Sequence, residues 1–301
     1  MTAGSDDQQS EAIDGVGSDE STREPTLNEG LKARLISAVI LIPISLGFVY
    51  VGGWPFALSL VFVSGLMAFE WNRLVLGQEN KGKITGYVLI YTALLACVLA
   101  LGLAGQWAFA LLLTGFTTVL VYVLAIRQRQ RAPWAALGVP YLFLPMLSFI
   151  WLRAGVDGAY GIATIVWILL VVWGSDSGGY IVGKSLGGPK LAPRISPNKT
   201  WSGFAGGVAL AMAAGLAMAF WVGEGSFLTF VLISAELSAI SQIGDLAESS
   251  VKRHFGVKDF SSLIPGHGGV FDRFDGLLFV LMAAGLLQVW HGGTLLIWSQ
   301  G

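Results

Sequence analysis

The sequence predicts an all-α, polytopic membrane protein with about nine transmembrane helices. Hydrophobic residues make up 54% of the 301-residue chain, charged residues only 12%, and the mean hydropathy is +0.68. A soluble domain carries about 25% charged residues, so this chain lacks the polar surface that water requires. Its apolar stretches are continuous, whereas a membrane barrel shows alternating segments of about ten residues. We therefore expect helices, which close their own backbone hydrogen bonds within the bilayer.

Residues 1–30 differ in character from the rest of the chain. They contain eight acidic residues and one basic residue, Arg23. Their polarity predicts a disordered cytoplasmic tail, and they lack the basic start and apolar core of a signal peptide. The remainder holds 17 basic and 11 acidic residues, a net charge of +6. This balance suits anionic partners such as lipid phosphates or nucleotides, although basic cytoplasmic loops are ordinary in membrane proteins.

The rest of the chain divides into apolar segments separated by short turns with helix breakers. Residues 31–160 are expected to form an N-terminal transmembrane region of about five spans, and residues 161–301 a C-terminal region of about four. The single cysteine, Cys97, excludes an intramolecular disulfide and a cysteine-based metal site. The predicted spans are about 35–52, 55–77, 84–104, 106–126, 135–153, 160–183, 203–222, 227–247 and 274–298.

Basic residues occur in every second connection between these segments, which indicates the orientation. Because cytoplasmic loops are enriched in Lys and Arg, we expect the N-terminus in the cytoplasm and the C-terminus outside a cytoplasmic membrane. The connections 184–202 and 248–273 are both long and lie on the cytoplasmic side in this arrangement. Ordered loops of this length are usually functional. The basic residues concerned are Lys32, Arg34, Lys81, Lys83, Arg127, Arg129, Arg131, Lys184, Lys190, Arg194, Lys199, Lys252, Arg253, Lys258 and Arg273.

The densest group of polar residues lies where the eighth segment ends. In a helix, Asp245, Glu248, Ser249 and Lys252 share one face because they follow the i, i+3, i+4, i+7 spacing. Two carboxylates, a hydroxyl and an amine suit a hard cation beside a phosphate. The alternative is a solvated helix end with an Asp–Ser and a Glu–Lys pair.

A glycine-rich run follows at residues 265–269 (PGHGG). Its backbone can approach a ligand closely and direct N–H groups at an anion. Asp272 and Asp275 then open the last span, with Arg273 between them. Acids at a helix start also serve as ordinary caps, but the two acids and the arginine exceed what a cap needs.

Two earlier stretches are further candidates. Asp176 lies within the sixth span, where a carboxylate is costly and usually functional. Glu70 in the second span is similar, but it has Arg73 at i+3 and is equally well explained as half of a structural pair. Residues 196–203 (SPNKTWSG) bring Lys199 and several hydroxyls to a helix start, where they can hold phosphate. The alternative is that the Lys199 side chain only extends to the membrane interface beside Trp201.

Residues 178–185 (GGYIVGKS) match the G-x-x-x-x-G-K-[ST] pattern of a P-loop. A true P-loop follows a strand and opens a helix of a soluble α/β domain. This match overlaps the end of a membrane span, so we expect it to be coincidental.

Together these residues resemble the signature of phosphatidate cytidylyltransferases. The resemblance rests on residues 249–253 (SSVKR), Lys258-Asp259 and residues 265–275 (PGHGGVFDRFD). The stretches 176–184, 196–201 and 244–246 also resemble that family. One departure is Ser202, where the family is expected to have a glutamate, so the detail of the site differs there.

The resemblance implies that phosphatidic acid attacks the α-phosphorus of CTP and that pyrophosphate leaves. It implies Mg²⁺, with room for a second cation, on Asp245 and Asp272, then Asp176, Asp275 and Glu248. Lys252, Arg253, Lys258 and Arg273 are expected to act at the phosphates as catalytic residues. The expected substrate-binding residues are Lys184, Ser196, Asn198, Lys199, Thr200, Ser249, Gly266, His267, Gly268 and Gly269.

The resemblance also suggests a homodimer in the bilayer, with no nucleic acid among its partners. Two other functions stay open from the residues alone. One is a CTP-dependent enzyme with a different lipid acceptor. The other is a transporter in which Asp176, Asp245 and Glu70 line an ion path.

Overall fold

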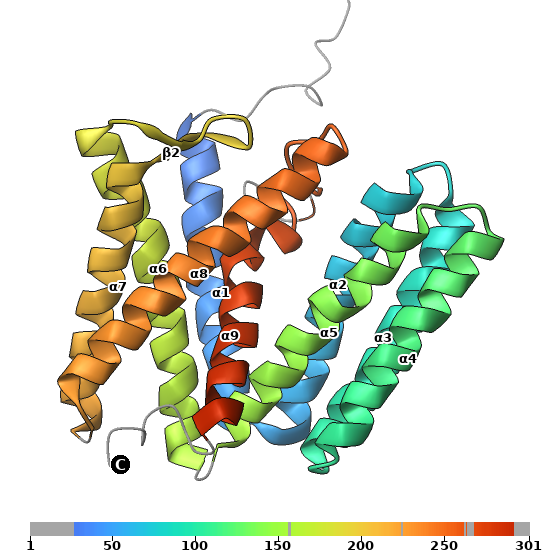
Figure 1. The fold of residues 1–301 in the computed structure, drawn as a ribbon, viewed down its shortest axis with the longest axis horizontal. Helices are drawn as coiled ribbons and strands as arrows, with labels where there is room; N and C mark the ends of the chain where they lie inside the picture. The colour runs from blue at the N-terminus through green and yellow to red at the C-terminus, as the bar shows by residue number, and fades with distance from the viewer. Residues whose placement is uncertain (1–26, 156–157, 224, 262, 264–267, 292–301) are drawn as a thin grey trace, which may run out of the picture.

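The computed structural model describes residues 27–155, 158–223, 225–261, 263 and 268–291, with side chains from Val39 onward. The expected tail falls almost entirely outside the described residues, as do Gly266, His267 and the end of the last span. The described part forms a bundle of helices that stand side by side (Figure 1). The helices are α1 Leu27–Val51, α2 Gly53–Leu76, α3 Lys81–Leu103, α4 Trp107–Arg127, α5 Ala132–Ala154, α6 Gly158–Leu186, α7 Trp201–Val222, α8 Phe227–His254 and α9 Asp275–His291.

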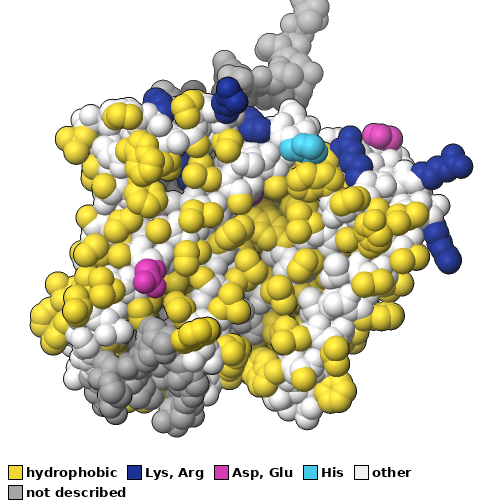
Figure 2. All heavy atoms as spheres, in the orientation of Figure 1, with side chains coloured by type: hydrophobic (Ala, Val, Ile, Leu, Met, Phe, Trp, Pro, Cys, Tyr) yellow, Lys and Arg dark blue, Asp and Glu magenta, His cyan; other side chains and the backbone are white. Residues whose placement is uncertain are grey.

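These nine helices of the described part match the nine predicted segments, and the all-α membrane class is confirmed. Seven of them, α2 to α8, are long and apolar enough to cross a membrane, and α1 and α9 contribute the shorter apolar stretches Val39–Val51 and Asp275–Trp290. Figure 2 shows a broad apolar belt, with lysine and arginine side chains gathered along one end of the molecule. That end carries the β2 label in Figure 1 and is called the basic end below.

Helices α6 and α7 pack closely because glycines face each other across their contact. A Cβ atom at Gly206 would lie 2.9 Å from the carbonyl oxygen of Gly178 and would overlap Val182. A Cβ at Gly203 would lie 2.8 Å from the carbonyl oxygen of Gly179. The P-loop-like run 178–185 therefore lies inside a helix, where its glycines serve helix packing.

The connection after α6 is an antiparallel hairpin of β1 Lys190–Ala192 and β2 Ser196–Thr200, which the sequence analysis did not predict. Lys190 pairs with Thr200, and Ala192 with Ser196. Thr200 then caps α7, since its Oγ1 accepts a hydrogen bond from Gly203 N at 3.1 Å. The hairpin thereby fixes Lys199 beside the start of α7.

An aromatic cluster holds the segment before α9 against the middle of the bundle. The rings of Phe260 and Phe271 are stacked with centroids 4.5 Å apart, and Trp71 of α2 stacks on Phe271 at 5.7 Å. Tyr141 of α5 contacts the Phe271 ring at 5.3 Å. Phe271 and Trp71 are fully buried. This packing fixes the 3₁₀ turn Phe271–Arg273, which carries Asp272.

Candidate active site

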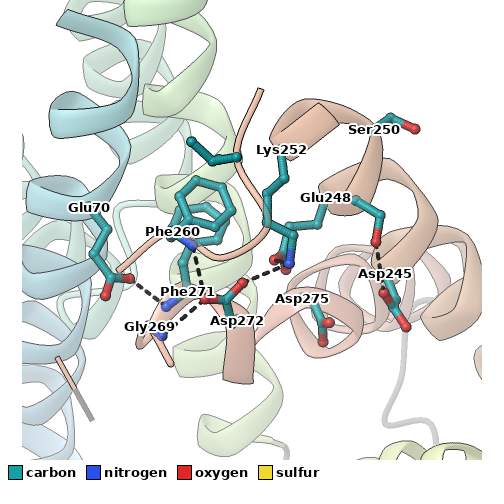
Figure 3. A network of polar contacts seen from close by, with 12 residues as sticks. Glu70, Asp245, Glu248, Ser250, Lys252, Phe260, Gly269, Phe271, Asp272 and Asp275 are labelled. Carbon is teal, nitrogen blue, oxygen red and sulfur yellow. Dashed lines mark hydrogen bonds and ion pairs between the residues drawn. The ribbon is translucent and has the colours of Figure 1, made fainter. Parts of the chain in front are cut away.

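Asp272 is the centre of the polar network at the basic end. One carboxylate oxygen accepts from Lys252 Nζ at 2.7 Å, and the other accepts from the backbone N–H groups of Phe260 at 3.1 Å and Gly269 at 3.0 Å (Figure 3). Burial favours the neutral carboxyl, but the bonds from Lys252 and Gly269 outweigh it and lower the pKa of Asp272 below its usual value. Asp272 is therefore a fixed anion that ties α8 to the segment before α9.

Lys252, in the last turn of α8, lies between two carboxylates. Its Nζ lies 2.8 Å from Glu248 Oε1 and 2.7 Å from Asp272 Oδ1. The Glu248 side chain is only 1% exposed. The structure contains both pairs predicted for this helix end, Glu248 with Lys252 and Asp245 with Ser249 through a hydrogen bond of 3.4 Å. The Glu248–Lys252 pair is buried, whereas the alternative explanation predicted a solvated pair. A buried charge needs a partner, so the two acids hold Lys252 in place.

A second ion pair joins the hairpin to α8. Lys199 Nζ lies 2.5 Å from Asp245 Oδ2. Lys199 therefore points into the bundle end and does not merely extend to the membrane interface. Arg253, about two turns beyond Asp245 on α8, reaches the carbonyl oxygens of Ile195 at 3.4 Å and Val257 at 3.3 Å.

Glycines in α8 and α9 bring Asp245 and Asp275 close together. A Cβ atom at Gly244 would lie 2.9 Å from the carbonyl oxygen of Asp275, and one at Gly276 would overlap Ser241. Asp275 opens α9, and its Oδ1 accepts from Gly276 N at 2.7 Å. Asp176 on α6 lies within electrostatic range of both acids. Three of the predicted acids thus converge from three helices.

The donor set fits Mg²⁺ with substrate phosphates, but not a cation held by protein alone. No group of three or more His, Cys, Asp or Glu within the described ranges is spaced to enclose a metal. Mg²⁺ commonly uses one or two carboxylates together with phosphate oxygens and water. Asp275, Asp176 and Asp245 offer hard oxygen ligands of this kind, although the oxygens of Asp245 contact Lys199 and Ser249. Both oxygens of Asp272 accept from protein donors.

The other predicted site residues lie outside the contacts made by Asp272 and Asp245, except for Gly269. Thr200 is buried and occupied as a helix cap, and Lys184 is exposed and hydrogen-bonds Tyr180 on its own helix. Ser196 and Asn198 lie on β2, and Lys258 and Arg273 are exposed near the network. Gly268 has a positive φ of 82° and Gly269 binds Asp272, so the described glycines shape the turn that holds this carboxylate.

Ser202 occupies the position where a glutamate was expected. Its hydroxyl donates to the carbonyl oxygen of Gly187 and lies 3.0 Å from Thr200 Oγ1. It thus joins the end of α6 to the start of α7, a role that needs no charge.

The hydrogen-bond partners of Glu70 differ from those that its sequence neighbours suggested. It is fully buried on α2 and accepts from Val270 N at 2.9 Å, from Phe271 N at 2.7 Å and from the Ser261 hydroxyl. These partners take the place of the Arg73 pair, which was one of the two predicted explanations for Glu70. An acid inside a span was the available signal, but its partners lie about 190 residues further along the chain. Glu70 fixes the same turn as Asp272 from the opposite side (Figure 3).

Comparisons with known proteins show the family of the chain. The chain matches the model of the cytidylyltransferase family over residues 32–290. A phosphatidate cytidylyltransferase of Brucella suis is 40% identical over 261 residues, which cover 86% of this chain and 92% of the relative. The phosphatidate cytidylyltransferase of Bacillus subtilis is 34% identical, with 83% of this chain and 95% of the relative covered. The chain therefore belongs to the cytidylyltransferase family.

Proposed function

We propose that this chain transfers CMP from CTP to phosphatidic acid and so makes CDP-diacylglycerol and pyrophosphate. The observation that carries the proposal is its membership of the cytidylyltransferase family, together with relatives named for phosphatidate that match nearly end to end. A bundle of apolar helices with a charged network at one end also suits one lipid and one water-soluble reactant.

In the proposed reaction a phosphate oxygen of phosphatidic acid forms a bond to the α-phosphorus of CTP. The bond from that phosphorus to the bridging oxygen breaks, and pyrophosphate leaves with the electron pair. A lipid phosphate is already an anion at pH 7, so no side chain need remove a proton from it. The barrier is then largely charge repulsion and positioning.

The cationic side chains of the network are suited to hold the phosphates. Lys199 and Lys252 lie against acids, and Arg253, Lys258 and Arg273 add further positive charge to this end of the bundle. Asp272, Glu248 and Glu70 act as positioning residues, because they hold Lys252 and the turn 268–273. An arrangement fixed before substrate binds lowers the reorganisation that the reaction needs.

Mg²⁺ is the cofactor we propose, held by Asp245 and Asp275 with Asp176 beside them. The ion would neutralise phosphate charge and draw the two anions together. Lys199 already pairs with Asp245, so an ion bound there would have to displace that ammonium group.

We further propose the topology indicated by the basic connections. The basic end then faces the cytoplasm, where CTP is found, the N-terminus lies on the same side and the C-terminus lies outside an inner membrane. A homodimer is the proposed assembly.

The test is a pyrophosphate-release assay with purified full-length protein, CTP, Mg²⁺ and lipid vesicles. Release that depends on phosphatidic acid supports the proposal. Release with a polyisoprenol or diacylglycerol but not with phosphatidic acid would instead favour a related CTP-dependent enzyme. Absence of CTP turnover, combined with ion flux in liposomes, would favour the transporter.

A further inference from the structure

The contact of α8 with α6 and α7 contains buried polar side chains. Helix α8 crosses these two helices obliquely (Figure 1). Ser234, Ser238 and Gln242 follow one another on α8 at intervals of four residues, so they share one face of the helix. Asp245 follows on the same face, one turn after Gln242. The two serines are fully buried, and Gln242 is 9% exposed. This face of α8 therefore leads along the membrane span to the acids of the candidate active site.

The two serines form hydrogen bonds with side chains of α6. Ser238 Oγ lies 2.8 Å from Ser175 Oγ, and Ser234 Oγ accepts from Trp167 Nε1 at 2.9 Å. Ser175 directly precedes Asp176, whereas Trp167 lies about two and a half turns before that acid. The Ser175–Ser238 bond therefore joins α6 to α8 next to an acid of the candidate active site, and the Trp167–Ser234 bond joins the same helices far from it.

Helix α7 approaches both hydrogen bonds through glycines. A Cβ atom at Gly207 would lie 2.7 Å from the carbonyl oxygen of Ser175 and 3.0 Å from Gln242 Nε2. Gln242 also donates to the carbonyl oxygen of Phe204 on α7 at 3.3 Å. Gly215 packs in a similar way against Ser234. Glycines allow helices to approach closely, but a hydrogen bond is directional and also restricts how one helix rotates against another.

The rotation of α6 matters for the candidate active site because of Asp176. This acid lies within electrostatic range of Asp245 on α8 and Asp275 on α9. A small rotation of α6 about its axis would move the Asp176 carboxylate relative to both. Hydrogen bonds between membrane helices change a stability constant by only about threefold on average. The Ser175–Ser238 bond therefore contributes little to the stability of the bundle, whereas it restricts the direction of the neighbouring acid.

We propose that Ser175 and Ser238 are positioning residues, which orient Asp176 toward the cation proposed to bind Asp245 and Asp275. Their hydrogen bond fixes the rotation of α6 against α8, and thereby the direction of the residue that follows Ser175. This inference rests on the proposed Mg²⁺ site, and it adds two buried hydroxyl groups that act only through Asp176.

The test is the Kd for Mn²⁺, measured by electron paramagnetic resonance of the full-length protein in detergent at a fixed CTP concentration. Ser238→Ala removes the hydrogen bond from α8, and Ser175→Ala removes it from α6. Ser234→Ala is the matched control, because it removes a bond of similar length between the same two helices. Ser234 is as buried as Ser238 and also lies against a glycine contact of α7. Tm and the transfer of labelled CMP to phosphatidic acid are measured on the same samples.

We expect Ser238→Ala and Ser175→Ala each to raise the Kd for Mn²⁺ about tenfold, the lower end of the range for groups that orient metal ligands. The double variant should raise it no further than either single variant, because both substitutions break the same bond. Ser234→Ala should keep the wild-type Kd, while all three single variants lower Tm by similar small amounts.

A wild-type Kd for Mn²⁺ in Ser238→Ala, or in Ser175→Ala should Ser238→Ala fail to fold, would overturn the proposal. An equal rise of the Kd in Ser234→Ala would also overturn it, because the effect would then come from helix packing in general. So would a double variant whose loss is the product of the two single losses, since the two serines would then act independently. Wild type that binds no Mn²⁺ would overturn this inference, and it would overturn the proposed function as well only if CMP transfer is also absent.

Discussion

Replacing Glu70 by glutamine tests whether the turn 268–273 depends on a carboxylate supplied by α2. Glu70 is fully buried, and its two oxygens accept from the Ser261 hydroxyl, Val270 N and Phe271 N. Glutamine has nearly the same shape but presents an NH₂ group to at least one of these donors. The substitution therefore isolates the hydrogen bonds from the packing.

The expected cost follows from the bonds that are lost. Hydrogen bonds to charged groups contribute about 1.5–3 kcal/mol each, so losing one and weakening the others should cost about 2–4 kcal/mol. In a chain of this size, a loss of that magnitude lowers Tm by about 4–12 °C. Because the turn carries Asp272, which holds Lys252, we also expect kcat/KM for CTP to fall by at least about tenfold.

The assays are pyrophosphate release and a thermal melt of the full-length protein in detergent. Glu79→Gln is the control, because Glu79 is exposed in the turn between α2 and α3 and should change neither quantity. If Glu70→Gln kept the wild-type kcat/KM and Tm, the carboxylate would not organise the turn and the reasoning would be refuted.

Three further predictions concern the same network and its support. Lys252→Met leaves Glu248 and Asp272 without their shared cation, so we expect turnover to fall more than about 100-fold and Tm to fall as well. The double variant Lys252→Met/Glu248→Gln should recover part of the lost Tm, and equal Tm values for the single and double variants would contradict the pairing. Gly206→Ala places a methyl group against Gly178 and Val182 and should cost about 1–3 kcal/mol, whereas Gly115→Ala, which meets open space, should not lower Tm. The pKa of Asp272 is lowered on folding, so the stability that its carboxylate contributes is present above the unfolded pKa and is lost as pH falls through the folded pKa. The Tm difference between wild type and Asp272→Asn should therefore stay constant from pH 8 to pH 5 and shrink only below about pH 4. A change in this difference near neutral pH would contradict the prediction.

The helices were predictable because membrane spans are set by local composition. An apolar stretch long enough to cross a bilayer has no other stable form, and the described ranges contain nine helices where nine were expected. The hairpin 190–200 was not predicted, since it is short and rich in Pro and charge, and its pairing depends on the neighbouring ends of α6 and α7.

The residue types of the site could be predicted from the sequence, but the contacts between them could not. Spacing along α8 places Asp245, Glu248 and Lys252 on one face. Spacing does not reveal that Lys252 would pair with Asp272, twenty residues later, or that Glu70 would bind the backbone of Val270. Such contacts depend on how separate helices pack, which the aromatic cluster and the α8–α9 glycines determine. The roles of Gly266 and His267 lie outside the described residues and stay predictions.

The most direct test of the proposed mechanism is Mn²⁺ binding, followed by electron paramagnetic resonance, in wild type and Asp245→Asn. CTP is present throughout, and transfer of labelled CMP to phosphatidic acid is measured on the same samples. Asp245 is chosen because it approaches Asp275 and Asp176 and contacts Lys199. We predict that Asp245→Asn loses the bound-Mn²⁺ signal and more than about 100-fold of the transfer rate, whereas Glu236→Gln, an exposed acid on the same helix, retains both. Full Mn²⁺ binding and transfer in Asp245→Asn would contradict the proposal that these converging acids hold a cation against the phosphates of CTP.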